Sequence, residues 1–308
     1  MKAVLLDAHG DVDKLRYGDA PDPQPGPGEI VVAIHAASVN GADYKVRLGK
    51  GRYRLDKMPH ILGRDFSGTV SALGAGATDF SVGDEVFGVT EQGIEGAYAE
   101  KVAISQKIVA KKPAALSHAE AAALGLVSLT ALWAIEDTAK LKKGETILIQ
   151  GGAGGVGGFA VQLARHIGAH VFATASTGNV NYVCNLGADR VIDYTYEDFT
   201  AIGPVCDVVF DTVGGDVRSG SYKVLKPGGR LVFIAPAPDG FVIPRNDIET
   251  MRPDVKRDRA HLERMVALIA AGAIARPEMT RYKLADAAQA HQISESRHLR
   301  GKLVFDVR

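Results

Sequence analysis

The chain has little cysteine, no excess of either charge and no long apolar run. Its 308 residues include only Cys184 and Cys206, too few for a disulfide framework, so we expect inert packing cysteines and a cytoplasmic location. Acidic and basic residues balance at 36 each, which argues against attraction of the whole chain to nucleic acid or to an anionic membrane. No stretch reaches the roughly 18 uninterrupted apolar residues of a membrane span, and the start lacks a leader pattern. We therefore expect neither a nucleic-acid nor a membrane partner.

The pattern of apolar and turn-forming residues changes near Ser117, which predicts two domains. The first part has short apolar runs such as "KAVLL", "IVVAIHAASV" and "DEVFGV", separated by glycine and proline, which is typical of a strand-rich domain. The segment "SHAEAAALGLVSLTALWAIEDTAKL" opens with a capping box of Ser117 and Glu120 and predicts a helix. Strands then alternate with helices, which predicts a parallel sheet covered on both faces.

The alternating part contains five predicted strands, "TILIQ", "HVFATA", "RVIDY", "DVVFDTV" and "RLVFIA". Helices are predicted after Gly155, over 179–186 and in "GSYKVLK". The last helix is predicted in "RAHLERMVALIAAG", with apolar residues at helical spacing. These residues are Leu262, Met265, Val266 and Ile269. The tail from "TRYKL" to "GKLVFDVR" returns to strand character.

The glycine spacing after the strand "TILIQ" predicts a dinucleotide site. Gly152, Gly154 and Gly157 satisfy the GxGxxG pattern between a strand and a helix. The first glycine makes the tight turn, the second lets the backbone approach a pyrophosphate, and the third lets the helix pack close to the strand. Free N–H groups and the dipole at the start of the helix favour phosphate. With a strand before and after this unit, the pattern favours a dinucleotide site over an unliganded turn.

The end of the next strand, "TAST", lacks the acidic residue that holds the ribose of NAD. A carboxylate about 4 Å from a 2′-phosphate charge would cost on the order of 4 kcal/mol at an effective dielectric of about 20, so its absence permits NADP(H). Ser176 and Thr177 are candidate phosphate ligands, with Asn179, Asn181 and Tyr194 as neighbours. Because no Arg or Lys stands here, a polar loop that accepts either dinucleotide is the alternative.

Taken together, the motifs resemble the medium-chain dehydrogenase/reductases, in particular the zinc-free quinone oxidoreductase branch related to zeta-crystallin. The resemblance runs along nearly the whole chain, through "PGPGEIVVAIHAASVNGADYKVRLG", "ILGRDFSGTV", "GVGGFAVQLAR", "LGADRVIDY", "FDTVGG", "LKPGGRLVFIA" and "RGKLVFDV". It implies an α/β fold in which a discontinuous, β-rich GroES-like catalytic domain, residues 1–117 and 269–308, carries an inserted Rossmann NADP-binding domain, residues 118–268. It also implies a homodimer, although "PAPDGFVIPRNDIETM" is shorter than the helical excursion of many relatives near the dimer contact and substrate entrance.

The positions at which zinc-dependent relatives carry ligands hold other residues here. The position of the early cysteine is Asn40, and the His-Glu pair is replaced by Arg64 and Asp65. An arginine in a ligand position repels a cation. Three scattered histidines remain as loose candidates: His35, His60 and His118. We expect no metal site.

Without a metal, the sequence favours reduction of an activated double bond over reduction of a plain ketone. Hydride from NADPH adds to a quinone or to the β-carbon of an α,β-unsaturated carbonyl, and the resulting anion is protonated by solvent. The resemblance implies that Asn40, Asp43 and Tyr53 line the pocket. Tyr53 would donate to the acceptor's carbonyl oxygen and Asn40 would position ribose or substrate. The alternatives are that Asp43 caps the following helix and that Tyr53 only packs.

The same resemblance implies a set of cofactor-binding residues along the chain. They are Thr130, Gly152, Gly154, Gly155, Val156, Gly157, Ser176, Thr177, Tyr194, Val213, Ile234, Ala235 and Lys302.

A basic segment from Arg47 to Arg64 leaves a second substrate class open. It also contains Lys50, Arg52, Arg54 and Lys57. These side chains form either a rim for an anionic substrate tail, such as a coenzyme A thioester, or a solvated loop. An enoyl-thioester reductase is therefore the alternative enzyme. A non-catalytic NADPH-binding sensor is the alternative from another class.

Overall fold

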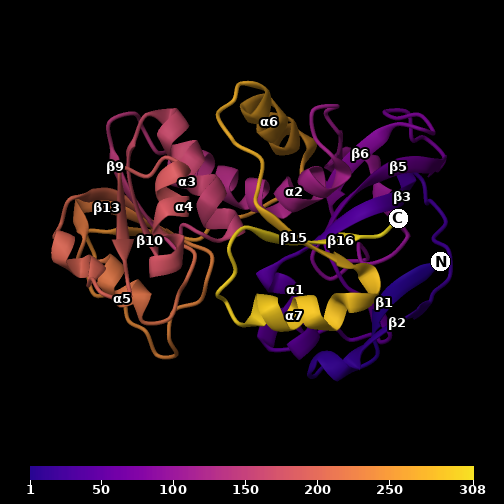
Figure 1. Cartoon of the computed structure of the whole chain (residues 1–308), viewed down its shortest axis with the longest axis horizontal. Coiled ribbons are helices and arrows are strands. Elements are labelled where there is room, and N and C mark those ends of the chain that lie inside the picture. The colour runs from indigo at the N-terminus through magenta and orange to yellow at the C-terminus, as the bar shows by residue number, and fades with distance from the viewer. The chain divides into compact units, whose positions relative to one another are not determined.

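The computed structural model describes the backbone of residues 1–308 and every side chain except that of Arg52. The chain forms two compact units (Figure 1). The first unit comprises Met1–Leu126, Arg257–Val266 and Arg276–Arg308, and the second unit comprises Val127–Lys256 and Ala267–Ala275. Strands dominate the first unit, and strands alternate with helices in the second, so the predicted α/β class is confirmed.

The first unit is built on two sheets. A seven-stranded sheet has the order β15-β16-β3-β5-β6-β8, with β7 paired to β3, and a three-stranded sheet has the order β2-β1-β4. Only β15 and β16 are parallel. The strands are β1 Lys2–Leu6, β2 Leu15–Asp19, β3 Glu29–Val39, β4 His60–Ile61, β5 Asp65–Leu73, β6 Glu85–Val89, β7 Lys101–Ser105, β8 Val109–Lys111, β15 Met279–Lys283 and β16 Lys302–Asp306.

Two helices of the first unit, α1 (Gly41–Leu48) and α7 (Ala287–Glu295), lie side by side (Figure 1). The prediction that the tail contains only strands was wrong, because α7 separates β15 from β16. Its buried positions follow helical spacing, but they are small or polar residues that leave no apolar signal. They are Ala287, Ala290, His291 and Ser294.

The predicted helix "RAHLERMVALIAAG" is confirmed as α6, Arg259–Ala270. Its buried apolar face is made by Leu262, Met265 and Leu268. Val266 and Ile269, which we expected on that face, are only half-buried. The buried residues Leu262, Met265 and Leu268 are each three positions apart, which keeps them on one side of the helix and explains the difference.

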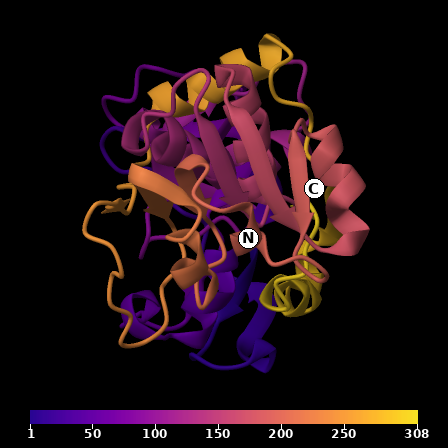
Figure 2. The ribbon, with the colours of Figure 1, turned by 90° about the vertical axis from the view of Figure 1, so that its left-hand side faces the viewer.

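The second unit contains a six-stranded sheet of order β11-β10-β9-β12-β13-β14, in which every pair is parallel, as predicted. Numbered from β9, this is the order 3-2-1-4-5-6 of dinucleotide-binding folds. Figure 2 turns this unit toward the viewer. The elements are β9 Thr146–Gln150, α3 Gly155–Ile167, β10 His170–Ala175, α4 Val180–Asn185, β11 Arg190–Asp193, β12 Cys206–Asp211, α5 Val217–Ser221, β13 Leu225–Phe233 and β14 Glu249–Met251.

Two sequence predictions for the second unit need correction. The helix expected in "GSYKVLK" ends at Ser221, because the chain enters β13 at Leu225 and Pro227 cannot continue a helix. Cys184 is exposed on α4 and is therefore not a packing residue. Cys206 is buried at the start of β12, and burial raises the pKa of its thiol to about 12, which keeps it unreactive.

Helix α2 (His118–Leu132) begins at the predicted capping box. The Ser117 N–H donates to Glu120 Oε2 over 2.7 Å, and the Glu120 N–H donates to Ser117 Oγ over 3.2 Å. The helix continues as a π-helical turn, Trp133–Thr138. By length and composition 118–138 could cross a membrane, and 89% of its apolar window is buried inside the protein, as in the core helices of globular chains.

Candidate functional site

The glycine loop of the second unit joins the end of β9 to the start of α3. Thr174, on the neighbouring strand β10, holds this loop in place. Its hydroxyl accepts the Gly151 N–H over 3.0 Å and donates to Gln150 Oε1 over 2.8 Å, and its carbonyl accepts the Gly152 N–H over 2.9 Å. Sequence reasoning missed this role, because it depends on the pairing of β10 with β9.

Two glycines of the loop have different reasons for being glycine. A Cβ on Gly157 would lie 2.1 Å from the carbonyl oxygen of Gly151, so helix and loop approach too closely for any side chain. A Cβ on Gly154 would have only ordinary contact, 3.8 Å to the same oxygen, and its φ of −74° suits any residue. Gly154 provides no side-chain cap, so the N–H groups of Gly155 and Val156 remain available to an anion.

The predicted phosphate ligands lie at the ends of β10 and β11. Ser176 and Thr177 follow β10, and the half-exposed Tyr194 follows β11. The hydroxyls of Thr177 and Thr195 are 2.8 Å apart, and Thr195 donates to Asp193 Oδ1 over 2.6 Å. Hydrogen bonds to its carboxylate, that from the Thr195 hydroxyl above all, lower the pKa of Asp193. Asp193 thus provides a carboxylate near the end of the sheet predicted to bind the ribose. The prediction was made from the end of the strand "HVFATA", and Asp193 belongs to the next strand, β11.

A third group of predicted residues surrounds the end of β12. The backbone carbonyl of Asp211 accepts the Ile234 N–H over 3.1 Å, and its carboxylate accepts the Val213 N–H over 3.0 Å. The buried guanidinium of Arg218 donates to the Ala235 carbonyl over 2.7 Å. All three groups follow carboxyl ends of parallel strands, so they lie along one edge of the sheet, where such folds bind nucleotides.

Two predicted cofactor-binding residues lie elsewhere. Thr130 is 7% exposed within α2, not in a loop that follows a strand of the parallel sheet. Lys302 lies at the start of β16 in the first unit and is buried.

Asn40, Asp65 and Lys302 form a buried polar cluster in the first unit. Lys302 Nζ donates to Asn40 Oδ1 over 2.8 Å, and Asn40 Nδ2 donates to Asp65 Oδ2 over 2.8 Å. The ammonium also lies 3.5 Å from Asp65 Oδ2. Positions 40 and 65 correspond to zinc ligands in the zinc-dependent relatives. Here, the residues at both positions contact a lysine ammonium. Arg64, the third such position, pairs with Glu95 over 3.0 Å.

Asp43 combines a capping contact with an unusual carboxyl group. Its Oδ2 accepts the N–H of Asn40, the N-cap of α1, over 2.8 Å, which confirms the capping alternative. The same oxygen accepts the Tyr98 hydroxyl over 2.7 Å, whereas Oδ1 is buried without a hydrogen-bond partner. Burial raises the pKa of Asp43 to about 6. Sequence reasoning missed Tyr98, which no local motif links to Asp43.

Tyr53 ends a short 3-10 helix, Gly51–Tyr53, and packs partly buried against the core of the first unit. The Lys45 ammonium lies 5.9 Å from the centre of its ring. The packing alternative is therefore confirmed as one role of this side chain. A role for its hydroxyl toward a substrate stays a prediction.

The basic segment presents fewer charges than its sequence suggests. Arg47 is fully buried and pairs with Asp11 and Glu295, and Arg64 is 4% exposed. Of the side chains that the structure describes in this segment, Lys50, Arg54 and Lys57 are exposed. A rim for an anionic substrate tail would have to be made from these.

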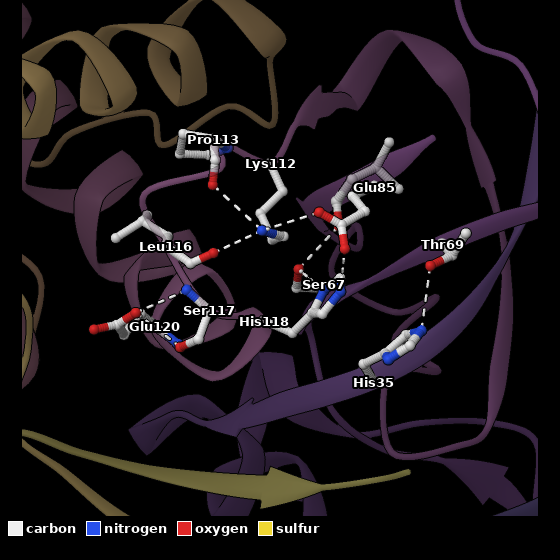
Figure 3. A network of polar contacts seen from close by, with 11 residues as sticks. His35, Ser67, Thr69, Glu85, Lys112, Pro113, Leu116, Ser117, His118 and Glu120 are labelled. Carbon is white, nitrogen blue, oxygen red and sulfur yellow. Dashed lines mark hydrogen bonds and ion pairs between the residues drawn. The ribbon is translucent and has the colours of Figure 1, made fainter. Parts of the chain in front are cut away.

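The three histidines named as loose metal-ligand candidates, His35, His60 and His118, contact other side chains. His35 and His118 stack with ring centres 4.3 Å apart, and burial lowers the pKa of both (Figure 3). His118 Nδ1 lies 2.8 Å from Ser67 Oγ, and its Nε2 lies 3.2 Å from Glu85 Oε1. This order mimics a nucleophilic triad, but Ser67 is fully buried and donates to the Val86 carbonyl, so it offers no reachable nucleophile.

His60 contacts Glu95 over 3.2 Å. Among the described residues, no group of three or more His, Cys, Asp or Glu side chains is placed to hold a metal ion.

Comparisons with known proteins agree with this arrangement. Residues 26–114 match the family described as alcohol dehydrogenase GroES-like domain, and residues 186–305 match the family described as zinc-binding dehydrogenase. The quinone oxidoreductase of Coxiella burnetii is 36% identical, with a TM-score of 0.92, and the match covers 100% of this chain and 99% of that one. The quinone oxidoreductase of Escherichia coli, solved in complex with NADPH, is 29% identical with a TM-score of 0.90, and both chains are covered completely, at 100% each.

A curated relative is longer than this chain. The 2-methylene-furan-3-one reductase of Solanum lycopersicum is 39% identical over 252 residues, which are 78% of this chain. The match spans 64% of the length of that reductase.

Proposed function

The chain belongs to the quinone oxidoreductase branch of the medium-chain dehydrogenase/reductases, and from this membership we propose that it is an NADPH-dependent reductase of quinones or α,β-unsaturated carbonyl compounds. The observation that carries the proposal is the uncapped start of α3 behind the glycine loop, at the carboxyl edge of a 3-2-1-4-5-6 sheet. The Solanum lycopersicum relative is named a 2-methylene-furan-3-one reductase, and the Coxiella and E. coli structures are named quinone oxidoreductases.

The residues at this edge fit a dinucleotide phosphate. Gly154, Gly155 and Val156 would face the pyrophosphate, because Gly155 and Val156 offer available N–H groups and Gly154 has no capping side chain to occupy them. Ser176, Thr177 and Tyr194 would hold the ribose end through hydroxyl groups. Val213, Ile234 and Ala235 would flank the nicotinamide. The NADPH in the E. coli structure supports NADP(H) as the cofactor. Within this proposal, residues 118–268 bind the cofactor, and residues 1–117 and 269–308 bind the acceptor.

The cofactor would supply the hydride, and the residues of this chain would orient and protonate the acceptor. Asn40 and Tyr53 offer N–H and O–H donors to a carbonyl oxygen on which negative charge develops. Asp43 holds a proton below about pH 6, since burial raises its pKa to about 6. The proton belongs on Oδ1, because Oδ2 already accepts two hydrogen bonds. Thr130 and Lys302 would support the site from buried positions.

The two glycines give a prediction that separates binding from stability. Gly154→Ala is expected to leave the melting temperature unchanged, since a Cβ there makes only an ordinary contact with the protein. It is expected to weaken NADPH binding by on the order of 10-fold or more, because the methyl group would obstruct the close approach of the pyrophosphate to the backbone. Gly157→Ala is expected to destabilise the protein by about 1 to 3 kcal/mol, because its Cβ meets backbone. Thermal unfolding without ligand and NADPH titration by fluorescence measure the two effects. Unchanged NADPH affinity in Gly154→Ala would exclude this loop as the phosphate site.

The activity itself is tested by following NADPH oxidation at the nicotinamide absorbance with a panel of quinones and enones. We expect turnover that prefers NADPH over NADH by about 10-fold or more, because the hydroxyl groups of Ser176, Thr177 and Tyr194 can donate to the 2′-phosphate that only NADPH carries. A chelator run in parallel should leave the rate unchanged. Turnover with NADH alone, or loss of activity on chelation, would contradict the cofactor or the metal proposal respectively. Tight NADPH binding without turnover would favour the sensor alternative, and a preference for coenzyme A esters would favour the enoyl-thioester reductase.

We also propose that the protein is a cytoplasmic homodimer. The family resemblance implies the dimer, and the low cysteine content favours a reducing compartment. Light scattering coupled to size exclusion measures the mass directly and would show a monomer if the dimer is wrong.

A further inference from the structure

We propose that the buried pair Lys302 and Asp65 fixes the orientation of the Asn40 carboxamide, which the proposed function assigns to the acceptor or the ribose. Lys302 and Asp65 are then positioning residues that act through Asn40. The inference rests on the proposed function for its catalytic consequence, but the orientation itself is measurable without any substrate.

The hydrogen bonds allow only one of the two flip states of the carboxamide. Its oxygen accepts from the Lys302 ammonium over 2.8 Å, and its nitrogen donates to the Asp65 carboxylate over 2.8 Å. In the flipped state an NH₂ group would face an ammonium and an oxygen would face a carboxylate, so both hydrogen bonds would be lost. Asn40 therefore presents one remaining N–H and one remaining lone pair in a defined direction.

Both charged partners are themselves held. Asp65 also accepts the Ser38 hydroxyl over 2.7 Å and the Leu126 N–H over 2.8 Å. Lys302 also donates to the Val39 carbonyl over 2.8 Å. Lys302 lies in β16, Asp65 lies in β5, and Asn40 directly follows β3. These strands are neighbours in the sheet order β16-β3-β5, so the backbone ladder keeps the charges in register.

The cluster is poorly explained as a device for stability. Asp65 is fully buried and Lys302 is 3% exposed, and the desolvation of such charges usually cancels their attraction. Burial lowers the pKa of Lys302, against the opposing influence of Asp65 and Asp43. Well-packed apolar side chains would hold the strands equally well, whereas only a donor on one side and an acceptor on the other select an amide orientation.

The first measurement is the side-chain amide NMR signal of Asn40, one of five asparagines in the chain. In the wild-type protein we expect two resolved Nδ2 protons that are protected from exchange. In Lys302→Met, which keeps most of the length of the side chain and removes the charge, we expect faster exchange. Rapid exchange in the wild type, or unchanged signals in the variant, would overturn the proposal. This readout needs no turnover, so its outcome is separate from that of the proposed function.

The second measurement is a double-mutant cycle on the reductase activity. Lys302→Met is expected to lower kcat/KM for the acceptor by on the order of 100-fold, as expected for a misplaced catalytic group. In the Asn40→Ala background the same change should have less than about a 2-fold effect, because Lys302 acts only through Asn40. Additive losses, or a Lys302→Met variant with wild-type kcat/KM, would refute the positioning role. Asp65→Asn repeats the cycle if Lys302→Met does not fold.

Lys112 provides the matched control, since it is a lysine of the first unit whose side chain is also only 5% exposed. Its ammonium donates to the Leu116 carbonyl over 2.6 Å and lies 3.2 Å from Glu85 (Figure 3). It has no hydrogen bond to Asn40 or Asp65. Lys112→Met should keep kcat/KM within about 2-fold of wild type and leave the Asn40 signals unchanged. An equal loss in both lysine variants would show that burial of any lysine matters rather than this contact.

Discussion

Arg218→Met is expected to lower the free energy of unfolding by about 3 to 5 kcal/mol, the usual cost of leaving one partner of a buried ion pair alone. Arg218 Nε donates to Asp211 Oδ2 over 2.6 Å, and the two side chains are 2% and 0% exposed. The guanidinium also lies 3.9 Å from the centre of the Phe233 ring. Without it, the Asp211 carboxylate would keep its charge in a dry environment with only backbone donors.

The same variant should also weaken NADPH binding, because the pair organises predicted cofactor-binding residues. Asp211 accepts the N–H groups of Val213 and Gly214, and Arg218 holds the carbonyl of Ala235. Loss of the guanidinium releases the Ala235 backbone at the end of β13. We expect a loss of affinity on the order of 10-fold, measured by titration under conditions where the variant is folded.

Arg190 supplies the control for Arg218 within the second unit. It lies 3.5 Å from Glu197 and 6.0 Å from the centre of the Phe172 ring, but both charged side chains are about half exposed, at 50% and 51%. Arg190→Met should cost less than about 1 kcal/mol in urea unfolding. The double variant Arg218→Met with Asp211→Asn should be more stable than Arg218→Met alone. Equal stability of the Arg218 and Arg190 variants would contradict the role assigned to the buried charge.

Acidification is expected to destabilise the first unit through His291. The free energy of unfolding should fall by about 5 kcal/mol in total once the pH is below the His291 pKa of both the unfolded and the folded chain. His291 is fully buried in α7, and neither ring nitrogen has a hydrogen-bond partner. Burial, assisted by the Arg47 charge, lowers its pKa from 6.5 to about 3. Between these two pH values the unfolded chain therefore binds a proton at His291 that the folded chain does not bind. Stability is complete above pH 6.5 and falls as the pH drops from 6.5 toward 3.

His291→Leu should remove this acid sensitivity. At about pH 4.5 the wild type should have lost roughly 3 kcal/mol through this residue, whereas the variant should lose correspondingly less. At neutral pH the variant should be at least as stable as wild type, because a buried imidazole without partners is replaced by an apolar side chain. Urea unfolding at both pH values gives the difference. Part of the acid sensitivity should persist, since burial also lowers the pKa of His35 and His118.

The exposed His298, close to His291 in the chain, is the control. His298→Leu should follow the wild-type pH dependence. If His291→Leu is as acid-sensitive as wild type, the charged form of His291 is accommodated in the fold and the burial argument is wrong.

Local patterns in the sequence were enough to predict the first two strands and the glycine loop of the second unit, and the start of α2. The strands "TILIQ" and "HVFATA", the glycine spacing and the capping box of Ser117 and Glu120 all appear as predicted. Apolar periodicity, turn residues and caps act within a few positions, so a sequence shows them directly. Helix α7 escaped this kind of prediction, because its buried face is made of alanine, serine and histidine and becomes a helix face only by packing against α1.

The sequence by itself determined the succession of strands, the glycine loop and the absence of zinc-ligand residue types at 40 and 64. Only the tertiary structure decided which polar groups are buried together. Lys302 and Asn40 are 262 positions apart and meet because β16 pairs with β3. Asp211 and Arg218 are only 7 positions apart, yet their pair depends on the sheet that excludes water around them. Burial is a property of the whole packed unit, and it sets the pKa and hydrogen-bond partners of each side chain.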